Sequence, residues 1–354
     1  MKKLLSLILA VVMIATIATA AFAEEYQVLN GFDPADFKSE KDPSEFKMAV
    51  VVKGVADWFS RLEEGVVEFA EKYGVDAHVE FPATTDAASQ LEIIDQLKTQ
   101  GYDAIIVVPN DSAALENTFK DAMEKGIVVI GHEASNLTNC LYDTEAFNAQ
   151  TNAVAKADAL IEATSGEGKY AIMVGYTTAI THMDYATRMV EYLKENAPGL
   201  ELLNDAIPTC ESKESTTTAY EQAKQVLKAD PDLAGFVCFC STDAAGISQA
   251  VEEMGLEGQV KIIGSGVPSV YAEELKDGLI YCVTTWDPKL SGYVACLTAY
   301  KVLMGEPVGD GSDLSDGGAA PGYEAVKLVT EDGNNCLLGS APCVGTGENV
   351  DELF

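Results

Sequence analysis

The sequence predicts an α/β protein of two lobes, each a parallel β-sheet covered by helices on both faces. Its 354 residues exceed what one hydrophobic core usually organises, so two lobes are expected. Apolar residues make up 47% of the chain, enough to fill two cores. Short apolar runs alternate with segments of helical periodicity, which is typical of parallel sheets connected through helices. This alternation occurs twice, and each occurrence predicts one lobe.

The first module contains apolar runs that predict its strands. Residues 47–52 read KMAVVV, and such an unbroken run is typical of a strand buried on both faces. The other expected strands are residues 76–81, 102–109 and 127–131. The helices expected between them, from their apolar spacing, are residues 58–74, 86–101 and 115–126. Asp86 is placed to cap the second helix, and Gly74 and Gly101 to end the first two.

The same order restarts near residue 143 and predicts the second lobe. Its expected strands are residues 169–175, 200–207, 233–240, 260–266 and 279–286. Its expected helices are residues 146–164, 184–199, 216–231, 244–258 and 269–278. A further helix is expected over residues 289–305.

Residues 1–23 have the layout of a secretory signal peptide. Two lysines precede a long apolar run that ends in Ala-Phe-Ala before Glu24, a small-x-small cleavage pattern. A transmembrane anchor is the alternative, because the run approaches the roughly 20 residues that a span needs. The acidic start of the remaining chain favours cleavage after Ala23, and residues 24–46 are polar and predict a flexible leader. No cysteine precedes Cys140 to carry a lipid anchor, so the periplasm is the expected location.

The formal charge of −33 and the isoelectric point near 4.2 limit the partners. Such a chain repels phosphate backbones and anionic membrane surfaces, so nucleic acid is not expected as a partner. Solubility alone accounts for a charge of this size.

Eight cysteines in an exported chain raise the question of disulfides. Cys336 and Cys343 flank a Gly/Pro-containing turn, LLGSAP, and a local bridge between them is one interpretation. Cys238 and Cys240 lie two apart in an expected strand, on the same face, which is poor geometry for pairing. For Cys238, Cys240, Cys282 and Cys296 the alternative is a small apolar residue in the core.

Neither module carries a nucleotide-binding or hydrolase motif. G-x-G-x-x-G does not follow the first strand of either module, and no G-x-x-x-x-G-K-[ST] loop occurs. No G-x-S-x-G elbow occurs, and HEASN at 132–136 lacks the second histidine of the H-E-x-x-H motif. The sequence therefore predicts no cofactor and no catalytic residue.

Polar and aromatic residues gather in the loops that follow the expected strands. Ligands of parallel sheets bind beyond the carboxyl ends of the strands, so two facing lobes would enclose a ligand between these loops. The loops include KGVADWF, PNDS, GHEAS, YTTAITHMD, CSTDAAG, SGVPS and TWDP. Both tryptophans of the chain, Trp58 and Trp286, fall in them, although packing in a core is the alternative for each. Rings beside carboxylates, amides and hydroxyls suit a polyhydroxylated ligand.

These features together resemble the sugar-binding proteins of ABC importers, the periplasmic binding group that takes up sugars such as ribose and rhamnose. The resemblance runs from about residue 47 to the end and rests on the order of the modules and on KMAVVVKGVADWFSRLEEGVVEFAEKYG, QGYDAIIVVPND, EKGIVVIGHE and TTWDPKLSGY. Within the group, Lys53, WDPKLSG, VGDGSDLSDGG and the ending NVDELF are most similar to the autoinducer-2 and rhamnose binders.

The resemblance implies the type I solute-binding fold, with two lobes joined by a three-crossing hinge that closes on the ligand. The crossings are then expected near Asp143, Trp286 and Ser312. One lobe would hold residues 47–143 and 287–312, and the other residues 144–286 and 313–354. The implied partners are a sugar-like small molecule and the membrane subunits of an ABC permease, with the protein as a monomer.

Several positions depart from the group. His132 and Glu133 stand where many sugar binders carry Asp, often followed by Arg, and Gly266 stands where many carry another Asp. An Asp-Gln pair typical of autoinducer-2 binders falls near Thr181 and His182. These departures point away from an ordinary pentose or autoinducer-2, whereas Lys53 and Asp287 still match the subgroup.

His132 has three interpretations: a ligand contact, a structural residue bonded to backbone, or a zinc ligand with Glu133 and His182. Asp184 is either a ligand contact or half of an ion pair with Arg188, four residues on in a helix. Asp243 is either a site residue or a helix cap. The alternative functions are a binder of an autoinducer-2-type signal, a cleft enzyme and a metal-binding protein. The expected ligand-binding residues are Lys53, Trp58, Phe59, His132, Glu133, His182, Asp184, Thr242, Trp286 and Asp287.

Overall fold

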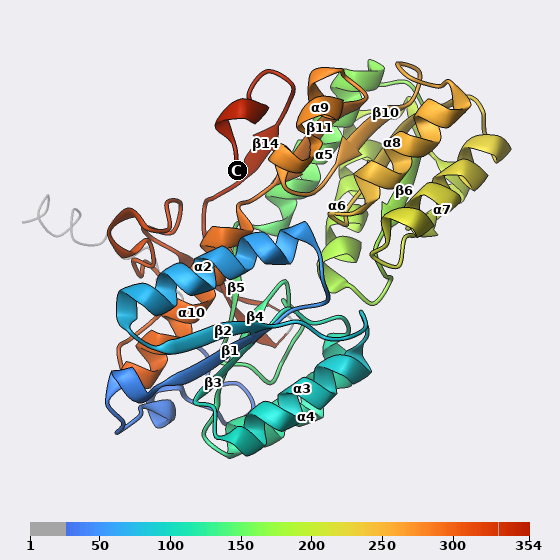
Figure 1. Cartoon of the computed structure of the whole chain (residues 1–354). Helices are drawn as coiled ribbons and strands as arrows, with labels where there is room; N and C mark the ends of the chain where they lie inside the picture. The colour runs from blue at the N-terminus through green and yellow to red at the C-terminus, as the bar shows by residue number, and fades with distance from the viewer. Residues whose placement is uncertain (1–25, 332) are drawn as a thin grey trace, which may run out of the picture.

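The structure is a computed structural model that describes residues 26–331 and 333–354. In these residues the strands form two sheets, one in each lobe, and helices cover both faces of each sheet (Figure 1). The predicted two-lobed α/β fold is confirmed. The expected signal peptide, residues 1–23, lies outside the described residues. Within them, no helix is both long and apolar enough to cross a membrane.

The first sheet has the strand order β12-β13-β5-β4-β3-β1-β2. Its strands are β1 (Lys47–Val51), β2 (Asp76–Glu80), β3 (Ala104–Val107), β4 (Val128–His132), β5 (Tyr142–Glu145), β12 (Lys327–Glu331) and β13 (Asn334–Leu338). All neighbours are parallel except β12 and β13. The paired helices that cover it are α2 (Asp57–Tyr73) with α10 (Pro288–Met304), and α3 (Ala87–Gln100) with α4 (Ser112–Glu124).

The second sheet has the order β14-β11-β10-β9-β6-β7, with β8 beside β6. Its strands are β6 (Gly168–Val174), β7 (Leu200–Leu202), β8 (Cys210–Glu211), β9 (Leu233–Cys238), β10 (Lys261–Gly264), β11 (Ile280–Thr285) and β14 (Cys343–Gly345). Only β14 is antiparallel to its neighbour. Its helices are α5 (Ala149–Thr164), α6 (Ile180–Asn196), α7 (Thr216–Ala229), α8 (Asp243–Met254) and α9 (Ala272–Lys276).

Local signals set most element boundaries. Every residue of β3 and β4 is buried, as their apolar sequences predict. Asp86 accepts a hydrogen bond from Ser89 N at the start of α3, and Gly101 ends this helix in the left-handed conformation. The strand expected over 200–207 is wrong beyond Leu202, because Asn204 and Asp205 adopt positive φ and turn the chain.

Both lobes have the same strand order. In each, the second strand lies on one side of the first, and the later strands follow one another on the other side. Consecutive strands β1 to β5 lie in the order β2-β1-β3-β4-β5, and the second lobe orders β7-β6-β9-β10-β11 in the same way. The change of side falls between β1 and β3 in one lobe and between β6 and β9 in the other. The loops after these strands diverge, so a crevice opens at each strand end.

The chain passes between the lobes at residues 146–148, 286–287 and 339–342. The first two positions agree with the expectation, but the third is not near Ser312. β12 and β13 join the first sheet through β5, so the assignment of residues 313–338 to the second lobe is wrong. Their strands pair with β5, a buried but polar strand (YDTE) that apolar patterning does not reveal.

The proposed bridge between Cys336 and Cys343 is also wrong in this structure. Cys336 belongs to β13 of the first sheet and Cys343 to β14 of the second, because the turn between them is the third crossing. All eight cysteines lie in the described residues and are free thiols there.

The expected flexible leader is packed on the first lobe over residues 26–46. Phe37 and Phe46 are buried, and Ser39 N donates to Leu303 O at 2.8 Å. Asp42 and Glu45 form a capping box around a short 3-10 helix, η2 (Pro43–Glu45). The expectation of a flexible leader is therefore wrong for residues 26–46. The segment is polar overall, but its few aromatic residues anchor it to the lobe.

Helices α2 and α10 touch backbone to backbone through glycines. A Cβ at Gly65 would lie 1.8 Å from Lys289 O, and one at Gly292 would lie 2.5 Å from Leu62 O. Gly65→Ala is expected to lower the free energy of unfolding by about 2 kcal/mol, because overpacking outweighs the helix preference of alanine. Chemical denaturation measures the change, and Gly309→Ala, which meets open space, is the matched control. A Gly65→Ala protein as stable as that control would contradict the close packing.

Candidate functional site

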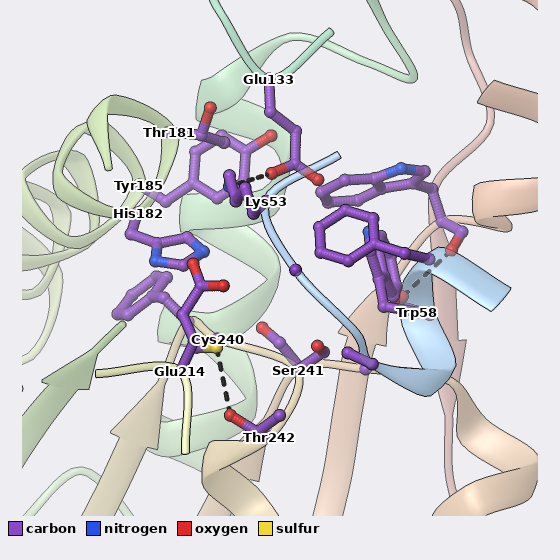
Figure 2. Close-up of a pocket in the computed structure, with 18 of the residues that line it drawn as sticks. Lys53, Trp58, Glu133, Thr181, His182, Tyr185, Glu214, Cys240, Ser241 and Thr242 are labelled. Atoms are coloured by element: carbon purple, nitrogen blue, oxygen red, sulfur yellow. Dashed lines mark hydrogen bonds and ion pairs between the residues drawn. The ribbon is translucent and has the colours of Figure 1, made fainter. Parts of the chain in front are cut away.

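A cavity that is partly open to solvent lies between the lobes (Figure 2). The first lobe lines it with Lys53, Gly54, Val55, Ala56, Trp58, Phe59, Thr85 and Glu133. The second lobe and the second crossing line it with Asn152, Thr181, His182, Tyr185, Glu214, Phe239, Cys240, Ser241, Thr242, Ser265, Gly266, Thr284, Thr285 and Trp286. Most of these residues follow the carboxyl ends of strands, so the cavity occupies the two crevices that the strand order creates.

The lobes also touch across this cavity. The Tyr176 hydroxyl, from the loop after β6, donates to Thr85 O at 3.3 Å. The Thr178 hydroxyl of the same loop donates to Asn110 O at 3.3 Å. The structure is therefore a closed form, and a change in the angle between the lobes would have to break these bonds.

A buried ion pair stands at the first-lobe wall. Lys53 follows β1, Glu133 follows β4, and Lys53 Nζ lies 2.6 Å from Glu133 Oε2. Their side chains are 3% and 6% exposed. Burial alone would raise the pKa of Glu133, but the Lys53 ammonium outweighs it and holds that pKa at about 2. Burial likewise opposes the charge of Lys53, and Glu133 and Glu214 raise its pKa overall.

Glu133 reaches this position through a left-handed backbone, with φ of 53°. Such a conformation is uncommon for a residue other than glycine, and at a ligand site it is one way to aim a side chain. The turn at Glu133 directs its carboxylate toward the cavity, where Figure 2 shows it beside Lys53.

His132 lies behind the cavity wall rather than on it. Its ring is 1% exposed, and Nδ1 donates to the Thr144 backbone carbonyl at 2.6 Å. Since a carbonyl only accepts, Nδ1 carries the proton, and Nε2 is buried with no partner in the described structure. The ring meets Trp286 edge-on at 6.3 Å between centroids. His132 thus packs behind Trp286, which lines the cavity.

His182 faces the cavity from the first turn of α6. Gly175 N donates to His182 Nδ1 at 3.3 Å, so the proton of the neutral ring sits on Nε2. Burial and the neighbouring Lys53 ammonium lower the pKa of His182 to about 3. The imidazole is therefore neutral at physiological pH and offers one N–H donor.

Glu214 enters the cavity from the second lobe. It follows β8 in a tight turn in which both Lys213 and Glu214 have positive φ, 59° and 53°. Burial raises the pKa of the Glu214 carboxyl, against the attraction of Lys53. Figure 2 shows its carboxylate directed at the cavity beside His182.

Aromatic rings form two walls. Trp58 and Trp286 meet edge-to-face at 4.8 Å between centroids, and Trp286 also packs edge-on against Phe147 at 5.5 Å. Phe59 and Phe239 add further ring surface from the first and second lobes. Ring faces of this kind can pack against the C–H surface of a sugar. The polar residues around them can form hydrogen bonds with its hydroxyl groups.

Several buried polar atoms that line the cavity have no hydrogen-bond partner within the described residues. They are Asn152 Oδ1, Thr181 Oγ1, Thr284 Oγ1 and Trp286 Nε1. Each belongs to a side chain less than a tenth exposed. A buried polar atom without a partner is costly, so four around one cavity indicate a polar ligand that would satisfy them.

Residues 48–307 match the sequence-family model of the periplasmic binding protein domain. The chain belongs to the periplasmic binding protein family. Among its relatives, the D-ribose/D-allose-binding protein of Pseudomonas aeruginosa is 25% identical over 292 residues, covering 78% of this chain and 88% of that protein.

Solved structures of similar fold include a solute-binding protein from Clostridium phytofermentas with bound L-rhamnose. Its TM-score is 0.78 at 21% identity, covering 87% of this chain and 98% of that one. LsrB from Clostridium saccharobutylicum in complex with AI-2 has a TM-score of 0.77 at 18% identity, covering 87% and 99%. The likeness confirms the predicted type I periplasmic binding protein fold.

Most of the residues expected at this family's cleft do line the cavity. These are Lys53, Trp58, Phe59, Glu133, His182, Thr242 and Trp286. Asp184 instead pairs with Arg188 at 2.8 Å and borders a neighbouring hollow. Asp287 caps α10 through Lys289 N and pairs with Arg61 at 2.8 Å. These two and His132 do not line the cavity. Each side chain is directed instead to the partner named above: Arg188, Arg61 or the Thr144 carbonyl.

Sequence reasoning missed Asn152, Tyr185 and Glu214, and it noted Thr181 only as a departure from the autoinducer-2 binders. Asn152 and Tyr185 lie within helices whose polar faces give no sign of a ligand. Glu214 lies in SKES, after a strand of two residues that apolar patterning does not detect. Asp243 is fully buried and directly follows Thr242, the N-cap of α8. Its carboxylate accepts a hydrogen bond from Cys240 N, and burial raises its pKa to about 7. It therefore braces the loop that carries Cys240 and Thr242.

Proposed function

We propose that this protein is the extracytoplasmic solute-binding component of an ABC importer, and that it captures a sugar or a similar polyhydroxylated molecule. One observation carries the proposal: a cavity closed between two lobes combines ring faces with buried polar atoms that lack partners. Hydroxyl groups would supply those partners, and the rings would cover the apolar face of the sugar.

The mode of action follows from the closed form. Opening would release the Tyr176 and Thr178 contacts across the cleft, admit the solute, and re-form them around it. Binding of the solute by both lobes then stabilises the closed form, which is the form delivered to the permease. The relatives support this role, since they are named for the binding of ribose or allose. The proposed partners are therefore a sugar and ABC permease subunits, with the protein acting as a monomer in the periplasm.

A second candidate is a binder of an AI-2-type signal. It is favoured by Lys53, which matches that subgroup, and by the fold shared with the AI-2 complex. Both candidates use the same cavity and make or break no bond, so they differ only in the ligand. An enzyme on this fold would consume the ligand, and recovery of unchanged ligand from the complex distinguishes binding from turnover.

A thermal-shift screen followed by calorimetry tests the proposal. The probes are pentoses, hexoses, deoxysugars, polyols and AI-2, with zinc as a control. A true ligand at a hundred times its Kd should add about 2.7 kcal/mol to the free energy of unfolding. Thr181→Val should then weaken binding of that ligand about tenfold with little change in the stability of the free protein, because Oγ1 has no partner to lose among the described residues. Absence of any stabilising sugar or signal would overturn the proposed function.

A further inference from the structure

The charged groups that line the cavity do not balance. They are Lys53, Glu133 and Glu214, and His182 beside them is neutral because burial and Lys53 depress its pKa to about 3. The one lining ammonium in the described residues is already engaged with Glu133 at 2.6 Å. With both carboxylates ionised, the lining carries one negative charge in excess, and that excess falls on Glu214, whose pKa burial raises.

The Glu214 carboxylate has no hydrogen bond and no ion pair in the described part of the chain, in contrast to Glu133. Hydrogen bonds hold the backbone of this turn. Glu214 N donates to Ser212 Oγ at 3.2 Å, and Lys213 N donates to Gly175 O at 2.9 Å. Ser212 itself is fully buried. The turn is held firmly, so the direction of the Glu214 side chain is set by the fold.

The position of the carboxylate is also set by close packing. A Cβ at Gly175 would lie 2.8 Å from Glu214 Cγ and 3.2 Å from His182 Cε1. Glu214 and His182 therefore both lie against the bare backbone of Gly175. Two successive residues with positive φ cost conformational energy, and such strain tends to persist where it positions a functional group.

We propose that the bound solute carries a protonated amino group that pairs with Glu214, which makes it an amino sugar or a similar amino polyol. This inference rests on the proposed function and names the chemical class of its ligand. An ammonium would pair directly with a carboxylate that lines the cavity with no ion pair of its own and only the longer-range attraction of Lys53, a larger gain than a hydroxyl provides. The same excess charge disfavours uronates and sugar phosphates, which would bring a second anion to the cavity.

Calorimetry with matched sugars tests the inference. The probes are D-glucosamine, D-galactosamine and D-mannosamine, each compared with its parent hexose and its N-acetyl derivative at a pH where the amine is charged. One amino sugar should bind at least about tenfold tighter than its parent and its N-acetyl form. This advantage should shrink as salt is added.

Matched variants locate the effect. Glu214→Gln should remove the advantage of the amino sugar and leave the free protein as stable as before or more so, since it removes an unpaired charge. Glu211→Gln is the control, because Glu211 has the same charge three residues away but pairs with Lys213 and does not line the cavity. It should leave the advantage intact.

Two results would overturn the inference. A neutral hexose that binds as tightly as its amino form would remove the role of the ammonium while leaving the proposed function standing. Equal losses for both sugars in Glu214→Gln would make Glu214 a general hydroxyl acceptor. Failure of every sugar, amino or neutral, together with the failure of the wider screen, would remove the proposed function as well.

Discussion

Replacing Lys53 by methionine is expected to lower the free energy of unfolding by about 3–5 kcal/mol and to abolish solute binding. Lys53 and Glu133 are almost completely buried and lie 2.6 Å apart. Removing the ammonium leaves the Glu133 carboxylate enclosed without its partner, and it also removes the attraction that Lys53 exerts on Glu214. Urea denaturation measures the first effect, and calorimetry with the identified ligand measures the second.

A double variant separates charge from packing. Lys53→Met combined with Glu133→Gln leaves neither member of the pair charged, so most of the lost stability should return. Binding should stay weak, because the polar contacts offered by the pair are gone. If the double variant is as unstable as Lys53→Met alone, the loss comes from packing around Lys53 and the unpaired-charge explanation is wrong.

The same pair makes the protein sensitive to acid in a defined window. The pKa of Glu133 is about 2 in the folded protein against 4.5 when unperturbed. A depressed carboxyl pKa contributes stability that is complete above pH 4.5 and is lost as the pH falls toward 2, about 3 kcal/mol in all. The double variant should lack this part of the acid response, which denaturation curves at several pH values will show.

Trp286→Ala is expected to cost about 3–5 kcal/mol of stability and to weaken binding roughly a hundredfold. The indole is 8% exposed, packs against Trp58 of the first lobe, and stands at the second crossing. Its loss opens a cavity where the hinge meets the ligand, and it frees the His132 ring from its edge contact. Denaturation and calorimetry measure the two changes independently.

Trp286→Phe is the control for this prediction. It keeps most of the ring contact with Trp58 and Phe147 but removes Nε1–H, which is buried without a partner in the described structure. Stability should fall by less than about 1.5 kcal/mol, whereas affinity should fall about tenfold. An unchanged affinity in Trp286→Phe would show that Nε1 does not contact the ligand.

The resemblance to known binders anticipated the hinge but not all of its course. The crossing near Trp286 follows β11, a strand that apolar patterning detects. The crossing near Asp143 follows the polar strand β5, so it was anticipated only from the restart of the strand–helix order there. The third crossing depends on β13 and β14, whose partners β5 and β11 are distant in sequence. Only the pairing of β13 with β5 shows that residues 327–338 return to the first lobe, and this pairing also separates Cys336 from Cys343.

His132 shows the limit of reasoning from position alone. It ends a buried strand, as the sequence predicts, and a residue at a strand end is expected to meet the ligand. In the folded chain β5 lies beside β4 and offers the Thr144 carbonyl, so the imidazole turns to that carbonyl. Its neighbour Glu133 lines the cavity instead, because its backbone is left-handed, and no sequence pattern predicts that conformation.

The sequence by itself determined the two-lobed α/β fold, and it placed at strand ends seven residues that line the cavity: Lys53, Trp58, Phe59, Glu133, His182, Thr242 and Trp286. These follow from periodicity and from the geometry of parallel sheets, which are local and general. Tertiary structure alone decided that Glu214 faces Lys53 from the other lobe and that Asp184 and Asp287 point elsewhere. The physical reason is that membership of the cavity depends on long-range strand pairing and backbone turns, whereas periodicity reports only which face of an element is buried.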